Sequence, residues 1–99
     1  RYHRHESFFY VTFDDRQEQM NTLAYRAGLR PYDRVIEHNG VNIEKLSSTE
    51  FQRRWETGRK ETTQLLVCSP ATYLHYKQLN QSITRKFLTV MLITPSLDL

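Results

Sequence analysis

Four segments of the chain have the apolar and β-branched pattern of strands. Residues 8–13 are aromatic and β-branched, which favours an extended backbone. Residues 33–38 carry Val and Ile at their centre, and residues 62–68 form an apolar run that ends before a proline. Residues 86–94 are a further β-rich run. We therefore predict a sheet built from these segments.

A tight turn connects the second of these segments to a short partner strand. Asn39-Gly40 is the strongest short-range hairpin signal, because a two-residue primed turn needs positive φ angles that Asn and Gly adopt at little cost. The next residues, 41–43, alternate apolar, polar and apolar. A β-hairpin is therefore predicted over residues 33–43.

The clearest helix signal follows this hairpin. Ser47 has Glu50 three residues later, which is the arrangement of a capping box. Phe51 and Trp55 are four residues apart and so share one helix face, and Gly58 marks the end of the helix.

Three other segments have weaker signals. Residues 22–27 are predicted to form one or two helical turns that stop at Gly28. Residues 71–80 have helical spacing. Residues 1–7 are polar and basic, and we expect a loop or a frayed terminus there.

Composition limits the chain to a single small domain. Its 99 residues suit one core, and the net charge of +3 favours anionic partners only weakly. The single cysteine, Cys68, excludes an intrachain disulfide, is expected in the core and fits a reducing compartment. The longest apolar-rich run, 87–93, is far shorter than the ~20 residues of a membrane span. A chain that starts with Arg1 fits a fragment or a processed product.

The order of these elements resembles a PDZ domain over about residues 8–79. The centre, 27–40, has Ala-Gly-Leu, a corner, Asp-Arg-Val-Ile and then Asn-Gly; residues 42–51 and 64–70 are similar to the family's second helix region and last strand. Residues 71–77 are similar to the segment that follows PDZ domains of the sodium–hydrogen exchanger regulatory factor type. The resemblance implies an α+β fold, a PDZ-like partly open β-barrel or sandwich with two flanking helices.

The chain departs from this family at its N-terminal end. By spacing, residues 8–13 match the third strand of the family, so its first two strands and its glycine-containing carboxylate-binding loop are expected to be missing or replaced. We expect a flexible N-terminal segment at 1–7, a PDZ-like domain at 8–80, and a C-terminal extension at 81–99 with a strand at about 86–94.

The resemblance implies a protein–protein interaction module that binds C-terminal peptides by β-strand addition. The family's groove positions fall on Ser48, Gln52 and Trp55, and Ser48 stands where the family often has His. Partners would be C-terminal tails of membrane proteins such as transporters or channels. The host would be a cytoplasmic scaffold or adaptor in signalling, at the inner face of the plasma membrane.

Two alternatives remain open. In the first alternative, the chain is a degenerate or truncated PDZ fragment with an occluded groove, and it acts structurally or by dimerisation. Separately, we predict that residues 87–93 fold back onto the sheet in place of a missing strand or of the peptide, and residues 86–99 are a candidate segment for self-association. In the second, Arg53, Arg54, Arg59 and Lys60 form a basic surface for anionic lipid rather than a solvated helix face. We expect no nucleic acid, since no exposed aromatic platform can be placed.

The remaining polar residues predict no catalysis. His3 and His5 would face one side of a strand, but no third metal ligand is near them in the sequence. His38 and His75 are expected on the surface. No nucleophile motif is present, and the three glycines are too scattered for a phosphate loop. We therefore expect neither an enzyme nor a metal or cofactor site.

Overall fold

The computed structural model describes residues 2–13, 23–57, 63–84 and 90–93. The described elements are, in chain order, β1 (Tyr2–His5), β2 (Phe8–Val11), α1 (Leu23–Arg26), β3 (Arg34–His38), β4 (Val41–Asn42), α2 (Ser48–Thr57), β5 (Leu65–Cys68), α3 (Pro70–Gln78) and β6 (Val90–Ile93).

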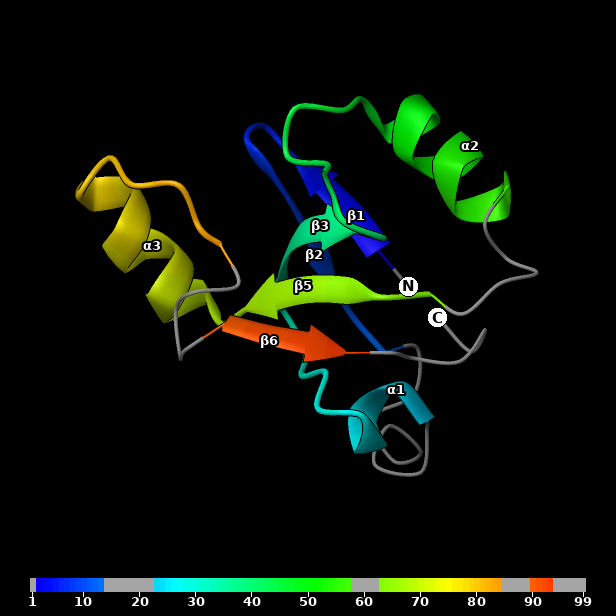
Figure 1. Ribbon diagram of the computed structural model, residues 1–99, viewed down its shortest axis with the longest axis horizontal. Helices are drawn as coiled ribbons and strands as arrows, with labels where there is room; N and C mark the ends of the chain where they lie inside the picture. The colour runs from blue at the N-terminus through cyan, green and yellow to red at the C-terminus, as the bar shows by residue number, and fades with distance from the viewer. Residues whose placement is uncertain (1, 14–22, 58–62, 85–89, 94–99) are drawn as a thin grey trace.

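One open antiparallel sheet organises the molecule. Its strand order is β1-β2-β3-β5-β6, and β4 pairs with β3 beside this path. Helices α2 and α3 lie on different sides of the sheet, and α1 lies near the end of the sheet away from α2 (Figure 1). This arrangement confirms the predicted α+β, PDZ-like fold class, and α3 confirms the helical spacing noted over residues 71–80.

The N-terminal segment is a strand rather than the expected loop. β1 pairs with β2 in register from Tyr2↔Val11 to His5↔Phe8. Two cross-strand ring pairs stabilise this hairpin, with centroid distances of 4.9 Å for His3 and Tyr10 and 4.8 Å for His5 and Phe8. Of the N-terminal strands that were expected to be missing or replaced, one place is filled, because β1 lies next to β2.

The C-terminal β-rich run folds back onto the sheet. β6 pairs with β5 along four residues, from Leu65↔Ile93 to Cys68↔Val90. It lies at the opposite end of the strand order from β1. This confirms the prediction that part of residues 86–94 joins the sheet, and it locates residues 90–93 beside β5 and away from β1.

The local signals at the turn and the helix start are confirmed. Asn39 and Gly40 have φ angles of 49° and 83°, as a primed hairpin turn requires. At the start of α2 the Glu50 N–H donates to Ser47 Oγ at 3.2 Å, and the Ser47 N–H donates to Glu50 Oε1 at 3.4 Å. Both halves of the predicted capping box are therefore formed.

Apolar side chains form a separate core on each face of the sheet. The core on the α2 side is the larger and consists of Phe9, Val11, Ala24, Leu29, Val35, Ile43, Phe51, Leu65 and Val67. The core on the α3 side consists of Ile36, Leu66, Cys68, Tyr73 and Ile83. Cys68 is buried as predicted, and burial raises the pKa of its thiol to about 12, which keeps it protonated and unreactive.

A β-bulge in β3 determines the position of His38. Val35 pairs with Val67 and Glu37 pairs with Leu66, so Ile36 is an extra residue opposite β5. Val35 faces the α2 side. On a regular strand, His38 would face the opposite side, because it is three residues further on. The extra residue in the pairing returns His38 to the α2 side. The prediction of a surface His38 is therefore wrong: only 2% of the residue is exposed.

Candidate functional site

The outer edge of β1 is an open end of the sheet. β1 pairs only with β2, and no strand within the described ranges pairs with its other side. The backbone N–H and C=O groups on such an edge can form a ladder with an added strand. This edge is the first component of the candidate site.

Helix α2 forms a wall beside that edge (Figure 1). The ring of Tyr2 lies 4.7 Å from the ring of Phe51 and 6.3 Å from that of Trp55, measured between centroids. Tyr2 is half-buried between the strand and the helix. Burial, and then the charge of Glu56, raises the pKa of its phenol, so the hydroxyl stays protonated near neutral pH.

The three helix residues predicted to line a groove lie on α2 at positions that share one face. The steps of four and three residues from Ser48 to Gln52 to Trp55 place them there. Ser48 and Gln52 are exposed, and Gln52 Nε2 donates to Glu56 Oε1 at 3.2 Å. Trp55 is half-buried against Tyr2, which directs this part of the helix toward β1.

Sequence reasoning missed the contacts made by β1, in which Tyr2 packs against α2 and Arg4 binds the segment after β4. The loop expected at residues 1–7 gives neither Tyr2 nor Arg4 a role. The Arg4 guanidinium carbon lies 4.7 Å from the centre of the Phe9 ring, and its Nη1 donates to the Glu44 carbonyl at 2.7 Å. The preceding strand β1 is recognisable only through its pairing with β2, and no local sequence signal pointed to it.

His38 and Arg54 lie where α2 packs against β3. The His38 ring is 6.1 Å from Phe51 and 5.6 Å from Trp55, and neither of its ring nitrogens has a hydrogen-bond partner. Burial, and then the nearby Arg54 charge, lowers the pKa of His38, so the ring is neutral at pH 7. Arg54 Nη2 donates to the His38 carbonyl at 3.0 Å, which ties α2 to β3.

The predicted basic cluster is only partly within the described residues. Arg53 is exposed, whereas Arg54 is half-buried and engaged with the sheet. Arg59 and Lys60 lie outside the described residues. Of this cluster, Arg53 is therefore the one cation among the described residues that is exposed on α2.

His3 and His5 face the same side of β1, as predicted, because their rings stack on Tyr10 and Phe8. Within the described ranges, no group of three or more His, Cys, Asp or Glu residues could hold a metal ion. His75 is exposed on α3, as predicted.

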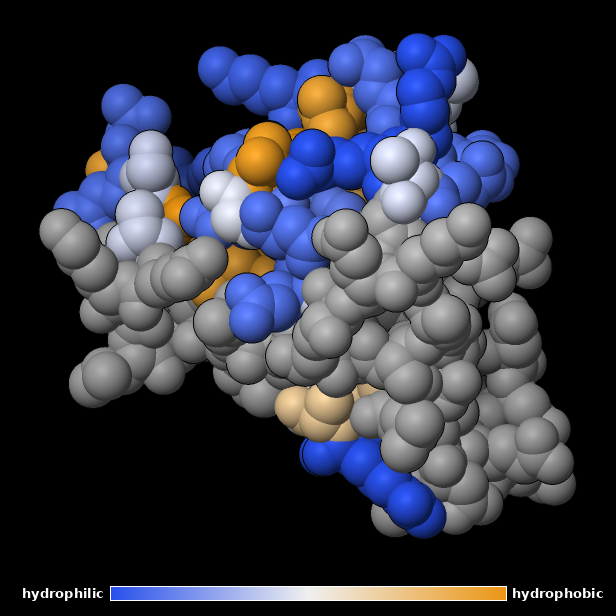
Figure 2. Space-filling view, turned by 45° about the vertical axis from the view of Figure 1, so that its right-hand side comes forward, coloured by the Kyte–Doolittle hydropathy of each residue, from blue (hydrophilic) through white to orange (hydrophobic). Residues whose placement is uncertain are grey.

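The surface around the wall is mostly polar. In the face drawn in Figure 2, the described residues are mainly hydrophilic, and hydrophobic ones appear only as small patches. None of the described helices is long and apolar enough to cross a membrane. The described residues of this face therefore form no broad apolar patch.

The fold is PDZ-like, and a free sheet edge lies beside helix α2. Over 56 residues the chain is 41% identical to the Na(+)/H(+) exchange regulatory cofactor NHE-RF2 of Mus musculus. The match covers 57% of this chain but only 16% of the relative. No family model matches the chain, and no solved structure matches it significantly. The relationship is partial and supports the resemblance noted above; the relative is named as a regulatory cofactor, not as an enzyme.

Proposed function

We propose that this protein is a peptide-binding interaction module that adds the C-terminal segment of a partner as a strand to the outer edge of β1. The observation that carries the proposal is the position of β1: it ends the sheet, and Tyr2 on it packs against Trp55 of α2. A peptide in this place would have a backbone partner on one side and a helix wall on the other.

Each part of the site would contribute differently to binding. The β1 backbone would supply ladder hydrogen bonds that are independent of ligand sequence. The rings of Tyr2 and Trp55 would contact an apolar ligand side chain, whereas Ser48 and Gln52 would offer a hydroxyl and an amide to polar ones. Specificity would therefore reside on α2 and affinity largely on β1.

The position of β6 supports an accessible edge. The alternative of an occluded groove requires a segment of the chain on β1, but residues 90–93 pair with β5 at the other end of the sheet. Among the described residues nothing else extends the sheet beyond β1.

We infer the ligand class and the setting from the resemblance and from the relative. C-terminal tails of transporters or channels are the ligands we propose, because the relative's name links it to Na(+)/H(+) exchange. The module would then act in a cytoplasmic scaffold or adaptor at the inner face of the plasma membrane.

A matched pair of variants tests the groove. Peptides with Ser or Thr two residues before a free C-terminus should bind the Ser48→His variant about fivefold more tightly than the unmodified chain, since imidazole can hydrogen-bond the ligand hydroxyl. Arg53→His places the same side chain on an exposed α2 position. This control should leave the dissociation constant unchanged, as measured by fluorescence polarisation.

The bound position is tested separately. In a nuclear magnetic resonance titration, amide shifts should concentrate on β1 and α2. Shifts confined to other elements, or equal effects of the two histidine variants, would contradict strand addition at β1.

A further inference from the structure

A cavity lies on the α3 side of the sheet, and none of the residues that line it belongs to α2. Its volume is about 1370 Å³, and its lining comes from the β1–β2 turn, the start of β3, the segment after β4, and α3. The hollow is large enough for several amino-acid side chains, since ligand pockets commonly measure roughly 300–1,000 Å³.

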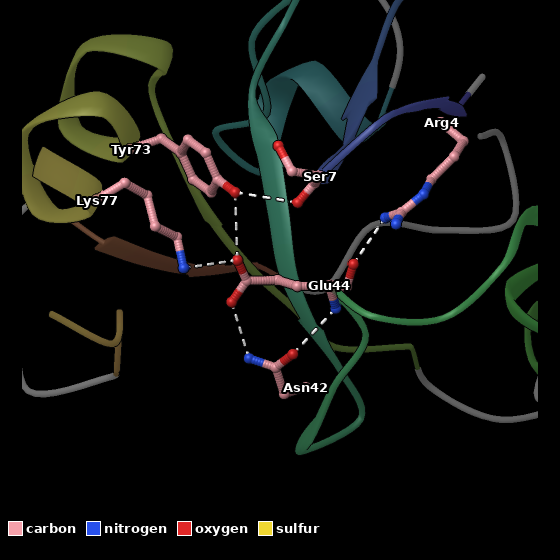
Figure 3. A network of polar contacts seen from close by, with 6 residues as sticks. All are labelled: Arg4, Ser7, Asn42, Glu44, Tyr73 and Lys77. Carbon is pink, nitrogen blue, oxygen red and sulfur yellow. Dashed lines mark hydrogen bonds and ion pairs between the residues drawn. The ribbon is translucent and has the colours of Figure 1, made fainter. Parts of the chain in front are cut away.

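A polar network holds one wall of this cavity in place (Figure 3). The Glu44 carboxylate is 2.9 Å from Lys77 Nζ and accepts from Asn42 Nδ2 at 2.9 Å. The Tyr73 hydroxyl lies 3.2 Å from the Ser7 carbonyl oxygen and 3.4 Å from Glu44 Oε2. Burial and the Glu44 charge raise the Tyr73 pKa to about 12, so this hydroxyl remains a donor. Tyr73 thus connects α3 to the β1–β2 turn, and Glu44 connects α3 to the segment after β4 and neutralises Lys77.

Three other cations of the lining have no carboxylate partner among the described residues. Arg4 donates to the carbonyls of Glu44 and Glu6, at 2.7 and 3.3 Å, and Arg34 Nη1 donates to the Tyr32 carbonyl at 2.6 Å. Carbonyl oxygens orient a guanidinium without neutralising it. Among the described residues, neither arginine nor the exposed Lys45 is ion-paired with a carboxylate. The lining therefore has an excess of fixed positive charge.

Apolar surface lies between these charges. The guanidinium carbon of Arg34 is 4.1 Å from the centre of the Phe8 ring, which in turn packs on Tyr73 at 5.4 Å. On α3, Leu74 lines the cavity with 58% of its surface exposed. A ligand that matches this lining needs both an apolar group and negative charge.

We propose that the cavity between α3 and the β1–β2 turn binds an acidic peptide segment that carries a hydrophobic side chain. Acidic side chains would pair with Arg34 and Lys45, and the hydrophobic one would cover Leu74 and Phe8. A peptide also brings N–H donors, which the carboxylates of Glu6 and Glu44 in the same lining can accept. In this lining, apolar Leu74 and Phe8 lie among the cations, which fits a peptide because acidic and hydrophobic side chains alternate along one chain.

The test uses a peptide with blocked ends, acetyl-Asp-Glu-Leu-Phe-Glu-Asp-amide, which has no terminal carboxylate. Lys45→Glu should weaken its binding about fivefold through the reversed charge, and Leu74→Ala about tenfold through lost apolar contact. Arg53→Glu makes the same charge change on α2, outside the lining, and should have little effect. Glu44→Gln frees Lys77 from its ion pair and should tighten binding about threefold.

Amide shifts should appear around Leu74 and Lys45, not on the outer edge of β1, so this proposal can fail while the strand-addition proposal stands. Equal weakening by Lys45→Glu and Arg53→Glu would reduce the effect to net charge and overturn the proposal. Absence of binding would overturn it as well. Binding of phosphatidylserine vesicles that depends on Lys45, without peptide binding, would assign the cavity to lipid instead.

Discussion

The two faces of the sheet are covered by helices in different ways. On the α2 side, Phe51 and Trp55 bring aromatic rings onto Tyr2 and His38. On the α3 side, Tyr73 is the one buried residue of the helix, and an ion pair between Lys77 and Glu44 completes the attachment.

This difference has a physical cause and a consequence. Rings that interdigitate fill space at the density of a protein interior, whereas a helix attached by one ring and a few polar bonds leaves a hollow next to it. The α2 side therefore offers a preformed wall beside a strand edge, and the α3 side offers a cavity with charged walls. Three predictions test this contrast.

The largest effect is expected from truncating one large apolar residue on each helix. Trp55→Ala should lower the free energy of unfolding by about 2–3 kcal/mol, less than for a fully buried indole, because Trp55 is half-buried. Leu74→Ala removes an exposed side chain on α3 and should cost less than about 0.5 kcal/mol. Urea denaturation of both variants measures the difference, and equal losses would contradict the contrast between the faces.

A loss of stability in mild acid is expected from buried His38 on the α2 side. Because the pKa of His38 is lowered below its ordinary value of 6.5, the unfolded chain takes up a proton before the folded one does. The contribution of neutral His38 to the free energy of unfolding is therefore fully present above about pH 6.5. It falls as the pH decreases toward the pKa of His38 in the folded chain, by at most about 1.4 kcal/mol per pH unit.

Denaturant titrations over a pH series measure this slope. His38→Phe should abolish that part of the slope, while His75→Phe on exposed α3 should keep it. An unchanged slope in His38→Phe would show that other groups cause the acid sensitivity.

The smallest effect is expected from one hydroxyl of the α3 side. Tyr73→Phe removes the contacts to Ser7 and Glu44 but keeps the ring, and should cost about 1 kcal/mol. Tyr32→Phe, at a residue 52% exposed, is the matched control and should stay within about 0.5 kcal/mol of the unmodified chain. A greater loss in the control than in Tyr73→Phe would show that the network does not attach α3.

Local chemistry was predictable from the sequence alone. The Asn39-Gly40 turn and the Ser47–Glu50 capping box involve residues at most three apart, so the sequence contains both partners of each interaction. Strand β5 and helix α3 were likewise expected from short apolar runs and from helical spacing. The order of these elements was enough to indicate the fold class.

Contacts between distant residues decided the rest. β1 is stabilised by its pairing with β2 and by the stacking of its histidines on the rings of β2. Residues 2–5 alone do not reveal these contacts. His38 is buried because one extra residue in the pairing of β3 with β5 exchanges the two faces, and only the partner strand fixes that register. Glu44 meets Tyr73 across 29 positions of sequence, so the cavity beside α3 arises only when helix and sheet are assembled.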